Sequence, residues 1–411
     1  ALFDVSGKIY AEFYAYLNTF WHDYRWQITD PITIVDFKVD FTRAPLMATQ
    51  NSGQLLINIG SNSEGRLNGN TSDGNDDVLL EIENGGKDVY ISSSAYKASR
   101  QKYTIGTGDK ILIDGATGKD SIKIKGSGYA NIEILGGTGD DTIDLGEYNA
   151  LGGQILIKGQ EGNDRILGSM SPSSTSRAYL FGDDGRLLSK SNAVIGAEAL
   201  MNPDGDGADT IIGATGIDVI FGGGGADRID GGAGGDYLIA DAGRYLIDQN
   251  KVDRTQLHEG GGNDVVVGGA DSDHIYGGTG NDKIDGGSGN DFLYGEKGND
   301  VILGGSGDDE IYGGEGIDVV FGDRVVGGSL ALATVFPVLP QGVAGTVSES
   351  DFVVDTRAGV VADSSTSFGG DHIEGGQGSD ILLGDNGASD VAGQVKDEII
   401  GGLDTDLISG D

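Results

Sequence analysis

Residues 259–321 consist of seven consecutive nonapeptides, which read EGGGNDVVV, GGADSDHIY, GGTGNDKID, GGSGNDFLY, GEKGNDVIL, GGSGDDEIY and GGEGIDVVF. Their shared template is Gly-Gly-x-Gly-x-Asp-x-U-x, in which U is a large apolar residue. A fixed period means that each copy is one structural unit, and that copies must stack on one another to bury an apolar face. The stretch therefore predicts a solenoid.

The two halves of each nonapeptide predict different local structure. Positions seven to nine alternate apolar and other residues, as a strand does. Positions one to six predict a turn, because glycines at positions one, two and four permit a positive φ. Two nonapeptides then close one coil of a flattened parallel roll. The side chains predicted to form its core are Val266, Ile275, Ile284, Leu293, Ile302, Ile311 and Val320.

Stacking brings position-six aspartates of successive coils together. Adjacent parallel strands lie about 4.8 Å apart, so the sequence predicts two files: Asp273, Asp291, Asp309 and Asp282, Asp300, Asp318. Two like charges at that distance repel by about 3 kcal/mol at an effective dielectric constant near 20. A divalent cation between layers reverses the sign of this interaction. Aspartate and carbonyl oxygens suit calcium, which accepts six to eight oxygens in flexible geometry, better than magnesium.

These repeats resemble the RTX, or haemolysin-type calcium-binding, nonapeptide family, found in very large repetitive bacterial secreted and surface proteins. The resemblance implies an all-β fold, a right-handed parallel β-roll or β-solenoid with several Ca²⁺ ions between its turns. In that family the position-six aspartate and main-chain carbonyls of the turn hold the ion. The resemblance implies this metal-binding role for Asp120, Asp141, Asp164, Asp209, Asp218, Asp227, Asp236, Asp264, Asp273, Asp282, Asp291, Asp300, Asp309, Asp318, Asp371, Asp380, Asp397 and Asp406.

Some copies depart from the template. Asp120, Asp141 and Asp164 belong to isolated copies, which are expected to bind calcium less readily because a site needs a partner turn in the next coil, and Asp76 is a weaker match. Position-four glycine is replaced by Asp271, Val395 and Asp404, which leaves the shape of those turns open. A metal-free β-solenoid with solvated aspartates is the alternative interpretation of the whole pattern.

Composition restricts the classes of partner. The formal net charge of −38 and the pI near 4.1 argue against binding to nucleic acid and to anionic membranes. The chain has no cysteine, so disulfides do not stabilise it. Glycine does not recur at every third position, which excludes collagen. The glycine turns also lack the Lys-Ser/Thr ending of a phosphate-binding loop.

The pattern divides the chain into three regions. Residues 1–50 are richer in aromatic residues and are expected to be the tail of a preceding β domain. Residues 51–170 predict an irregular β-solenoid with isolated turns of the repeat type. Residues 171–411 predict the calcium roll, interrupted by loops or hairpins at about 181–204, 240–259, 323–368 and 385–396. Both ends look cut, so a piece of a longer protein is expected.

The third interruption contains the apolar stretch VVGGSLALATVFPVLPQGVAG at residues 325–345. Its prolines and glycines argue against a transmembrane helix. Two β-strands packed on the roll are the favoured interpretation, and a partner contact is the alternative.

Catalytic residues are not predicted. The four histidines, His22, His258, His274 and His372, stand singly, without a His-Glu-x-x-His zinc motif. His274 and His372 occupy position seven, where an exposed strand residue is expected. A Gly-x-Ser-x-Gly nucleophile motif is also absent from the sequence.

Two functional hypotheses follow. The first is an extracellular calcium-binding structural module of a large bacterial protein, such as an adhesin, surface coat or filament, which folds on calcium binding after export. The resemblance implies type I secretion machinery as a partner, and other copies or cell-surface components are further candidates. The second hypothesis is the carboxy-terminal carrier region of a secreted protease, lipase or epimerase, or of a pore-forming toxin.

Overall fold

The computed structural model describes residues 46–66, 74–93, 98–170, 177–190, 193–200, 207–247, 251–252, 261–323, 370–384 and 397–409. By its internal contacts the chain divides into two units, residues 1–43 and 44–411, and every described residue belongs to the second. The strands expected in residues 1–45, the apolar stretch 325–345, His22 and His258 lie outside the described residues.

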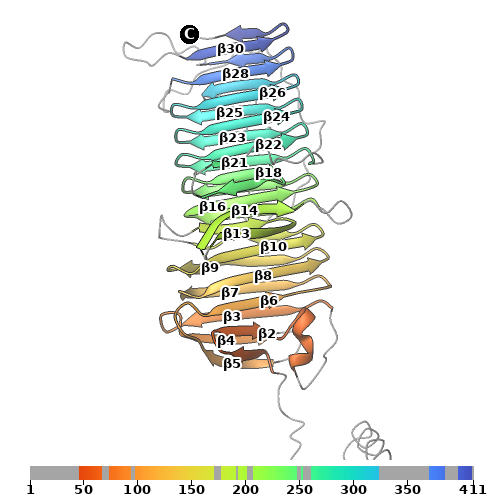
Figure 1. Ribbon diagram of the computed structural model, residues 1–411, viewed down its shortest axis with the longest axis vertical. Helices are drawn as coiled ribbons and strands as arrows, with labels where there is room; N and C mark the ends of the chain where they lie inside the picture. Colours follow the sequence, from red (N-terminus) through yellow and green to blue (C-terminus); the bar gives the residue numbers. More distant parts are fainter. Residues whose placement is uncertain are drawn as a thin grey trace, which may run out of the picture. The chain divides into compact units, whose positions relative to one another are not determined.

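Two long sheets, one of 13 and one of 14 strands, form the described part of the second unit. In Figure 1 the strands of each sheet lie one above another from β2 to β30. Sheet A contains β1 (Ala48–Asn51), β2 (Gln54–Ile57), β6 (Lys110–Asp114), β8 (Asn131–Thr138), β10 (Ile155–Glu161), β12 (Arg177–Phe181), β16 (Ile217–Gly223), β18 (Tyr237–Asp241), β22 (His274–Thr279), β24 (Phe292–Lys297), β26 (Glu310–Glu315), β28 (His372–Gln377) and β30 (Glu398–Leu403).

Along most of the roll, the chain passes from a strand of sheet A to a strand of sheet B and back. Sheet B contains β3 (Asp77–Glu83), β4 (Asp88–Ser93), β5 (Ala98–Thr104), β7 (Ser121–Gly128), β9 (Thr142–Ala150), β11 (Arg165–Leu167), β15 (Thr210–Thr215), β17 (Arg228–Ala233), β21 (Val265–Ala270), β23 (Lys283–Ser288), β25 (Val301–Ser306), β27 (Val319–Asp323), β29 (Ile381–Leu383) and β31 (Leu407–Ser409).

The pairing register confirms that two nonapeptides make one coil. Ile275 pairs with Leu293, and Leu293 with Ile311, which are steps of 18 residues between parallel strands. The next partner in the same file is Ile373, because the third interruption lies between these two coils. The prediction of an all-β parallel solenoid is therefore confirmed.

The core lies between the two sheets. All seven side chains predicted to point inward are fully buried, and they join inward residues of the upstream strands in one continuous cluster. This cluster includes Ile111, Ile134 and Ile157, so the region before the regular repeats shares the same core. A side chain at position eight is thus covered by its counterparts one coil above and one coil below.

The strands are longer than the sequence predicted. β22 covers positions seven to nine and then one to three of the next repeat, and Gly278 and Thr279 pair with Glu296 and Lys297 of the next coil. The prediction that positions one to six form a turn was wrong for positions one to three. The reason is that identical coils stack in register, so the amides and carbonyls at these positions find partners in neighbouring coils.

The first coils differ from the rest of the roll. β1 pairs with β2, and β3, β4 and β5 pair in sequence, all antiparallel. A short 3₁₀ helix, η1 (Gly60–Arg66), follows β2. On β5, Arg100 lies over the ring of Tyr90 at 3.7 Å and pairs with Glu81 at 2.9 Å. Charged side chains on an edge strand oppose further strand addition.

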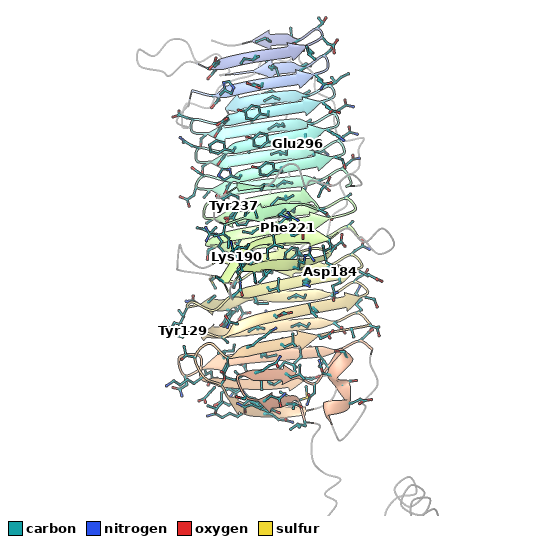
Figure 2. The ribbon with its side chains drawn as sticks, in the orientation of Figure 1. Tyr129, Asp184, Lys190, Phe221, Tyr237 and Glu296 are labelled. Atoms are coloured by element: carbon teal, nitrogen blue, oxygen red, sulfur yellow. The ribbon has the colours of Figure 1, made fainter. Side chains whose placement is uncertain are left out.

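A third, four-stranded sheet covers the outer face of sheet A. It contains β13 (Asp184–Lys190), β14 (Ala193–Leu200), β19 (Arg244–Leu246) and β20 (Lys251–Val252), which come from the first two interruptions. Its buried residues Ala197 and Tyr245 pack in one cluster with Phe221 and Tyr237 of sheet A. The latter two are labelled in Figure 2. We call these four strands the covering sheet.

Aromatic rings stack along the outer face of sheet A. The rings of Tyr276, Tyr294 and Tyr312 lie 5.0 and 4.8 Å apart, nearly parallel. His274 lies between Tyr237 and Phe292, with ring centroids 4.7 Å from each. His274 is thus half-buried in a ring stack rather than exposed as the sequence predicted, and this burial lowers its pKa. Stacking of identical positions places rings face to face at the inter-strand distance.

Within the described ranges, none of the helical segments has the length and apolar character needed to cross a membrane.

The core predicts a large effect of truncation at position eight. Ile302→Ala should lower the free energy of unfolding by about 2–5 kcal/mol, because it leaves a cavity between coils. The matched control is Ile317→Ala, since Ile317 is 55% exposed and its loss should change the value by less than about 0.5 kcal/mol. Urea unfolding in calcium, followed by circular dichroism, measures both. Equal effects of the two variants would contradict the core assignment.

Glu198 predicts a pH-dependent contribution to stability. Burial raises its pKa, but hydrogen bonds from Arg244 and Arg186 on the two flanking strands outweigh burial and hold the pKa below 4.5. Because the pKa of Glu198 is lower in the folded state than in the unfolded chain, the ionised side chain stabilises the fold above pH 4.5. This stabilisation is lost as the pH falls through the folded-state pKa. Glu198→Gln should therefore lower stability by about 2 kcal/mol at pH 7, with the difference from wild type vanishing in acid.

Thermal unfolding of both proteins between pH 3 and 7 checks this expectation. Glu83→Gln is the control, since the Glu83 side chain is 52% exposed beside Arg100 and an exposed pair contributes little. A difference between wild type and Glu198→Gln that does not depend on pH would contradict the assignment.

Candidate metal sites in the turns

The position-six aspartates form two files, one along each long edge of the roll. The first aspartate file lies where the chain passes from sheet A to sheet B. It contains Asp76, Asp120, Asp141, Asp164, Asp209, Asp227, Asp264, Asp282, Asp300, Asp318, Asp380 and Asp406. The second aspartate file lies at the opposite edge. It contains Asp218, Asp236, Asp273, Asp291, Asp309, Asp371 and Asp397.

One oxygen of each carboxylate links successive turns. The main-chain amide of Asp273 donates to Oδ1 of Asp291 at 2.9 Å, and the amide of Asp291 donates to Oδ1 of Asp309 at 2.9 Å. The same contact repeats along both files, so the two predicted sets of stacked aspartates are adjacent in the structure. Each carboxylate therefore holds the turn of the preceding coil in register with its own.

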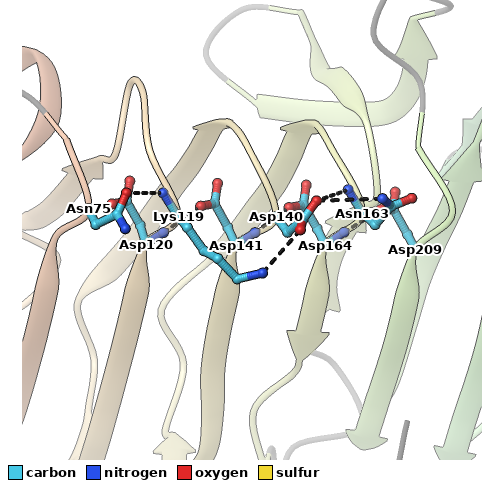
Figure 3. Close-up of polar contacts among 8 residues, drawn as sticks. All are labelled: Asn75, Lys119, Asp120, Asp140, Asp141, Asn163, Asp164 and Asp209. Carbon is cyan, nitrogen blue, oxygen red and sulfur yellow. Dashed lines mark hydrogen bonds and ion pairs between the residues drawn. The ribbon is translucent and has the colours of Figure 1, made fainter. Parts of the chain in front are cut away.

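The isolated upstream copies belong to the first aspartate file. The amide of Asp120 donates to Asp141 and that of Asp141 to Asp164, both at 2.7 Å, and Figure 3 shows this row continuing to Asp209. These copies therefore have partner turns in the next coil. Sequence separation hid the contact, because 21 and 23 residues, rather than 18, separate these coils.

The second carboxylate oxygen is buried and accepts no hydrogen bond at most positions of both files. A main-chain carbonyl oxygen of the next coil, which is also an acceptor, lies close to many of these atoms. The residues with this orphan Oδ2 atom are Asp141, Asp164, Asp218, Asp227, Asp236, Asp264, Asp273, Asp282, Asp291, Asp300, Asp309, Asp318 and Asp380. A buried ionised oxygen without a partner strongly opposes folding, so each of these atoms requires a proton or a cation.

Position-one glycine provides the space in which Oδ2 lies. A Cβ atom on Gly286 would come within 2.5 Å of both Oδ2 of Asp291 and the carbonyl oxygen of Gly304 in the next coil. A side chain at Gly286 would therefore displace the Asp291 carboxylate. Two acceptor oxygens thus converge above the same glycine with no donor between them.

Burial dominates the electrostatics of the files. It raises the pKa of Asp273 to about 9, although the hydrogen bond from the Asp236 amide opposes this shift. It also raises the pKa of Asp300 and Asp309 to about 8, and neighbouring aspartates of the same files add to the shift. Without a cation, the ionised carboxylates are therefore unfavourable near neutral pH.

Position-five residues form a second ladder, which the sequence analysis missed. Oδ1 of Asn281 accepts the amide of Asn299 at 2.8 Å, and Oδ1 of Asn263 accepts the amide of Asn281 at 2.7 Å. This ladder runs opposite to the aspartate ladder, because here the side chain of the lower coil accepts from the upper one. The signal was present in the recurring Asn-Asp pair, which the template reduced to a variable position.

Aspartate at position four keeps a positive φ but not the value that glycine takes there. Asp271 and Asp404 have φ values of 77° and 81°, whereas the position-four glycines Gly280 and Gly289 have 136° and 142°. Aspartate tolerates the left-handed region better than most residues. The local turn shape therefore differs at these two positions, and Val395 lies outside the described residues.

The ends of the files differ from their middle. Asp76 is the first residue of the first aspartate file. It differs from the middle of the file because its Oδ2 accepts a hydrogen bond from the amide of Gly60 at 2.8 Å. Asp397 and Asp406 are partly exposed, whereas Asp371 and Asp380 are buried. These two C-terminal candidates therefore lie in a more solvated environment than the others.

The donor set fits a hard cation. The orphan oxygens belong to carboxylates that lie near main-chain carbonyls, such as that of Gly304 for Asp291 and that of Ala240 for Asp227, and oxygen-only donors favour calcium over softer metals. Within the described ranges, no group of three or more His, Cys, Asp or Glu side chains is placed to hold a metal. A cation at these turns would therefore draw part of its coordination from main-chain carbonyls. The aspartates named above would hold it, and it would neutralise their buried charge.

Sequence comparison identifies the repeat. A family model described as RTX calcium-binding nonapeptide repeat (4 copies) matches residues 133–147, 204–238, 260–293, 285–320 and 365–390. These ranges contain the candidate aspartates except Asp120, Asp164, Asp397 and Asp406. A search of the curated proteins finds no match.

The orphan oxygens predict that a charge-neutral substitution in a file weakens calcium binding. Asp291→Asn removes one buried negative charge, so the calcium concentration at the folding midpoint should rise by about tenfold, or ~1.4 kcal/mol. Asp271→Asn is the control, because Asp271 is exposed on the turn before Asp273 and tolerates asparagine at its positive φ. Calcium titration calorimetry measures both. Equal calcium binding by the two variants would contradict the assignment of Asp291 as a calcium-binding residue.

Proposed function

Because the chain carries RTX calcium-binding nonapeptide repeats, we propose that it is a calcium-dependent structural module of a secreted or cell-surface bacterial protein. Its role is mechanical and non-catalytic. It folds into a stiff roll when it binds calcium outside the cell, as part of an adhesin, a surface coat or a filament. Other copies of the chain and cell-surface components are its partners.

One observation carries this proposal: two files of carboxylates run along the edges of the roll, and most of them are buried with one oxygen that accepts no hydrogen bond. In a calcium-poor compartment these charges oppose stacking of the coils. In millimolar calcium the ions join the coils, so that binding free energy becomes folding free energy. The module is then unfolded during export and folded after it, which suits passage through a type I secretion channel.

The proposal assigns the acidic residues to cation binding and none to catalysis. His372, the described histidine with charged partners, contacts Glu374 at 3.1 Å and Glu398 at 3.3 Å. All three lie at outward positions of parallel strands in sheet A, where side chains in register contact one another. Such a contact supports a surface role of this histidine rather than an acid–base pair.

The proposal predicts that calcium controls the fold. After exhaustive chelation at pH 7.5, the chain should lose its β-type circular dichroism spectrum and expand, and added calcium should restore both properties. Each site filled at 100 times its dissociation constant adds about 2.7 kcal/mol to the free energy of unfolding. The control is magnesium at the same concentration, which keeps its water and should restore little structure. An unchanged spectrum and hydrodynamic radius after chelation would overturn the proposal.

A further inference from the structure

Two turns of the first aspartate file are interrupted by the segments that build the covering sheet. In both turns the chain leaves after position two, which is Asp183 in one and Asp241 in the other. It returns at Gly207 and Gly261, two and three residues before the position-six aspartates Asp209 and Asp264. Each interrupted turn is therefore assembled from two pieces of chain that are distant in sequence.

Uninterrupted turns show what position two normally supplies. The carbonyl of Ala116, at position two, accepts the amide of Thr138, at position three of the next coil, at 2.9 Å. Position two also takes a positive φ in these turns, even where it is Glu296 or Gln160, with values of 78° and 79°. That conformation lets the strand continue into its own turn while its carbonyl faces the next coil.

At the interrupted turns a side chain takes the place of this carbonyl. Oδ2 of Asp183 accepts the amide of Gly224 at 2.7 Å, and Oδ2 of Asp241 accepts the amide of Thr279 at 2.7 Å. Gly224 and Thr279 both stand at position three of the next coil. Neither Asp183 nor Asp241 has a positive φ, because the chain leaves the coil at these two residues.

The position of the oxygen supports the same conclusion. In an uninterrupted turn, the atom nearest to a Cβ built on position-two Gly287 is the carbonyl oxygen of Gly269 in the coil below. At Gly278 and Gly223 the nearest atoms are Oδ2 of Asp241 and of Asp183. The carboxylate oxygen thus occupies the place that the departing main chain vacates.

The same aspartates also hold the returning chain. Oδ1 of Asp183 accepts the amide of Gly207 at 3.3 Å. In the second turn the link passes through Thr279, whose hydroxyl donates to Oδ2 of Asp241 at 3.0 Å and accepts the amide of Gly261 at 3.0 Å. The departing and returning ends of each insertion are therefore joined through one carboxylate.

We propose that Asp183 and Asp241 are positioning residues that close the interrupted turns. Each supplies a side-chain oxygen in place of a missing main-chain carbonyl and fixes the returning strand, so the roll accepts an insertion without losing its aspartate file. The ladder indeed passes through both turns, from Asp164 through Asp209 to Asp227 and from Asp227 through Asp264 to Asp282. In the sequence, the Gly182–Asp183 pair recurs at Gly322–Asp323 and Gly384–Asp385, where the nonapeptide is again interrupted, whereas Asp241 follows Ala240.

Hydrogen exchange of the full chain in saturating calcium tests this role. Asp241→Ala removes the acceptor, so the amides of Thr279 and Gly261 and those of β19 should exchange at least about tenfold faster. Asp241→Asn keeps an acceptor oxygen and should restore most of the protection. Glu315→Ala, which removes an exposed carboxylate at position three of an uninterrupted turn, is the control and should exchange like wild type.

Calcium stoichiometry, measured on the same variants, separates positioning from ligation. The proposal expects Asp241→Ala to bind as many ions as wild type. It is overturned if Thr279 and β19 exchange in Asp241→Ala as they do in wild type, or if Asp241→Asn loses as much protection as Asp241→Ala. It is also overturned if Asp241→Ala binds fewer ions while the exchange of Thr279 stays unchanged. These outcomes leave the calcium dependence of folding, tested separately by chelation, unaffected.

Discussion

The structure depends on the two unequal oxygens of a buried aspartate. Oδ1 accepts a main-chain amide of the preceding coil and sets the register, while at most positions of the files Oδ2 is buried and accepts no hydrogen bond. The first contact requires the carboxylate to be buried at the turn, and the second makes that burial unfavourable unless a cation is present. A single side chain thus makes stacking geometrically specific and energetically conditional. Asparagine could provide the first property but not the second.

Position five shows how this arrangement remains stable against slippage. The aspartate ladder joins each turn to the coil above it, and the Asn263, Asn281 and Asn299 ladder joins each turn to the coil below it. The aspartate side chains accept amides from the coil below, and the asparagine side chains accept amides from the coil above. If one coil slid along its neighbours, hydrogen bonds of both ladders would therefore break. The recurring Asn-Asp pair is therefore a register device, while the orphan oxygen of the aspartate makes the contact responsive to cations.

The sequence predicted the features that follow from strict repetition. Stacking of Asp282, Asp300 and Asp318 and burial of Ile284 and Ile302 follow from the period of nine alone. It did not predict contacts across irregular spacing, such as Asp120 with Asp141, because the coil length there differs from 18 residues. It also did not predict the covering sheet, since pairing of β14 with β19 joins two insertions that no repeat relates. Whether each named aspartate binds calcium stays a prediction.

The two parts of the roll differ in how many of their edges carry aspartates. Upstream of Asp218 only the A-to-B edge carries a described aspartate file, and the nearby lysines pair with other acidic residues, Lys119 with Asp140 at 3.0 Å and Lys123 with Asp144 at 2.6 Å. From Asp218 onward both edges carry aspartates, and every described coil except the last buries two carboxylates. Lysine pairs on exposed strands cannot reach the buried Oδ2 atoms, since a long side chain would need the space that position-one glycine leaves to the carboxylate. A small cation between the main-chain carbonyls can reach these Oδ2 atoms. The regular repeats therefore concentrate the buried carboxylates, and with them the need for a neutralising cation or proton, in the downstream coils.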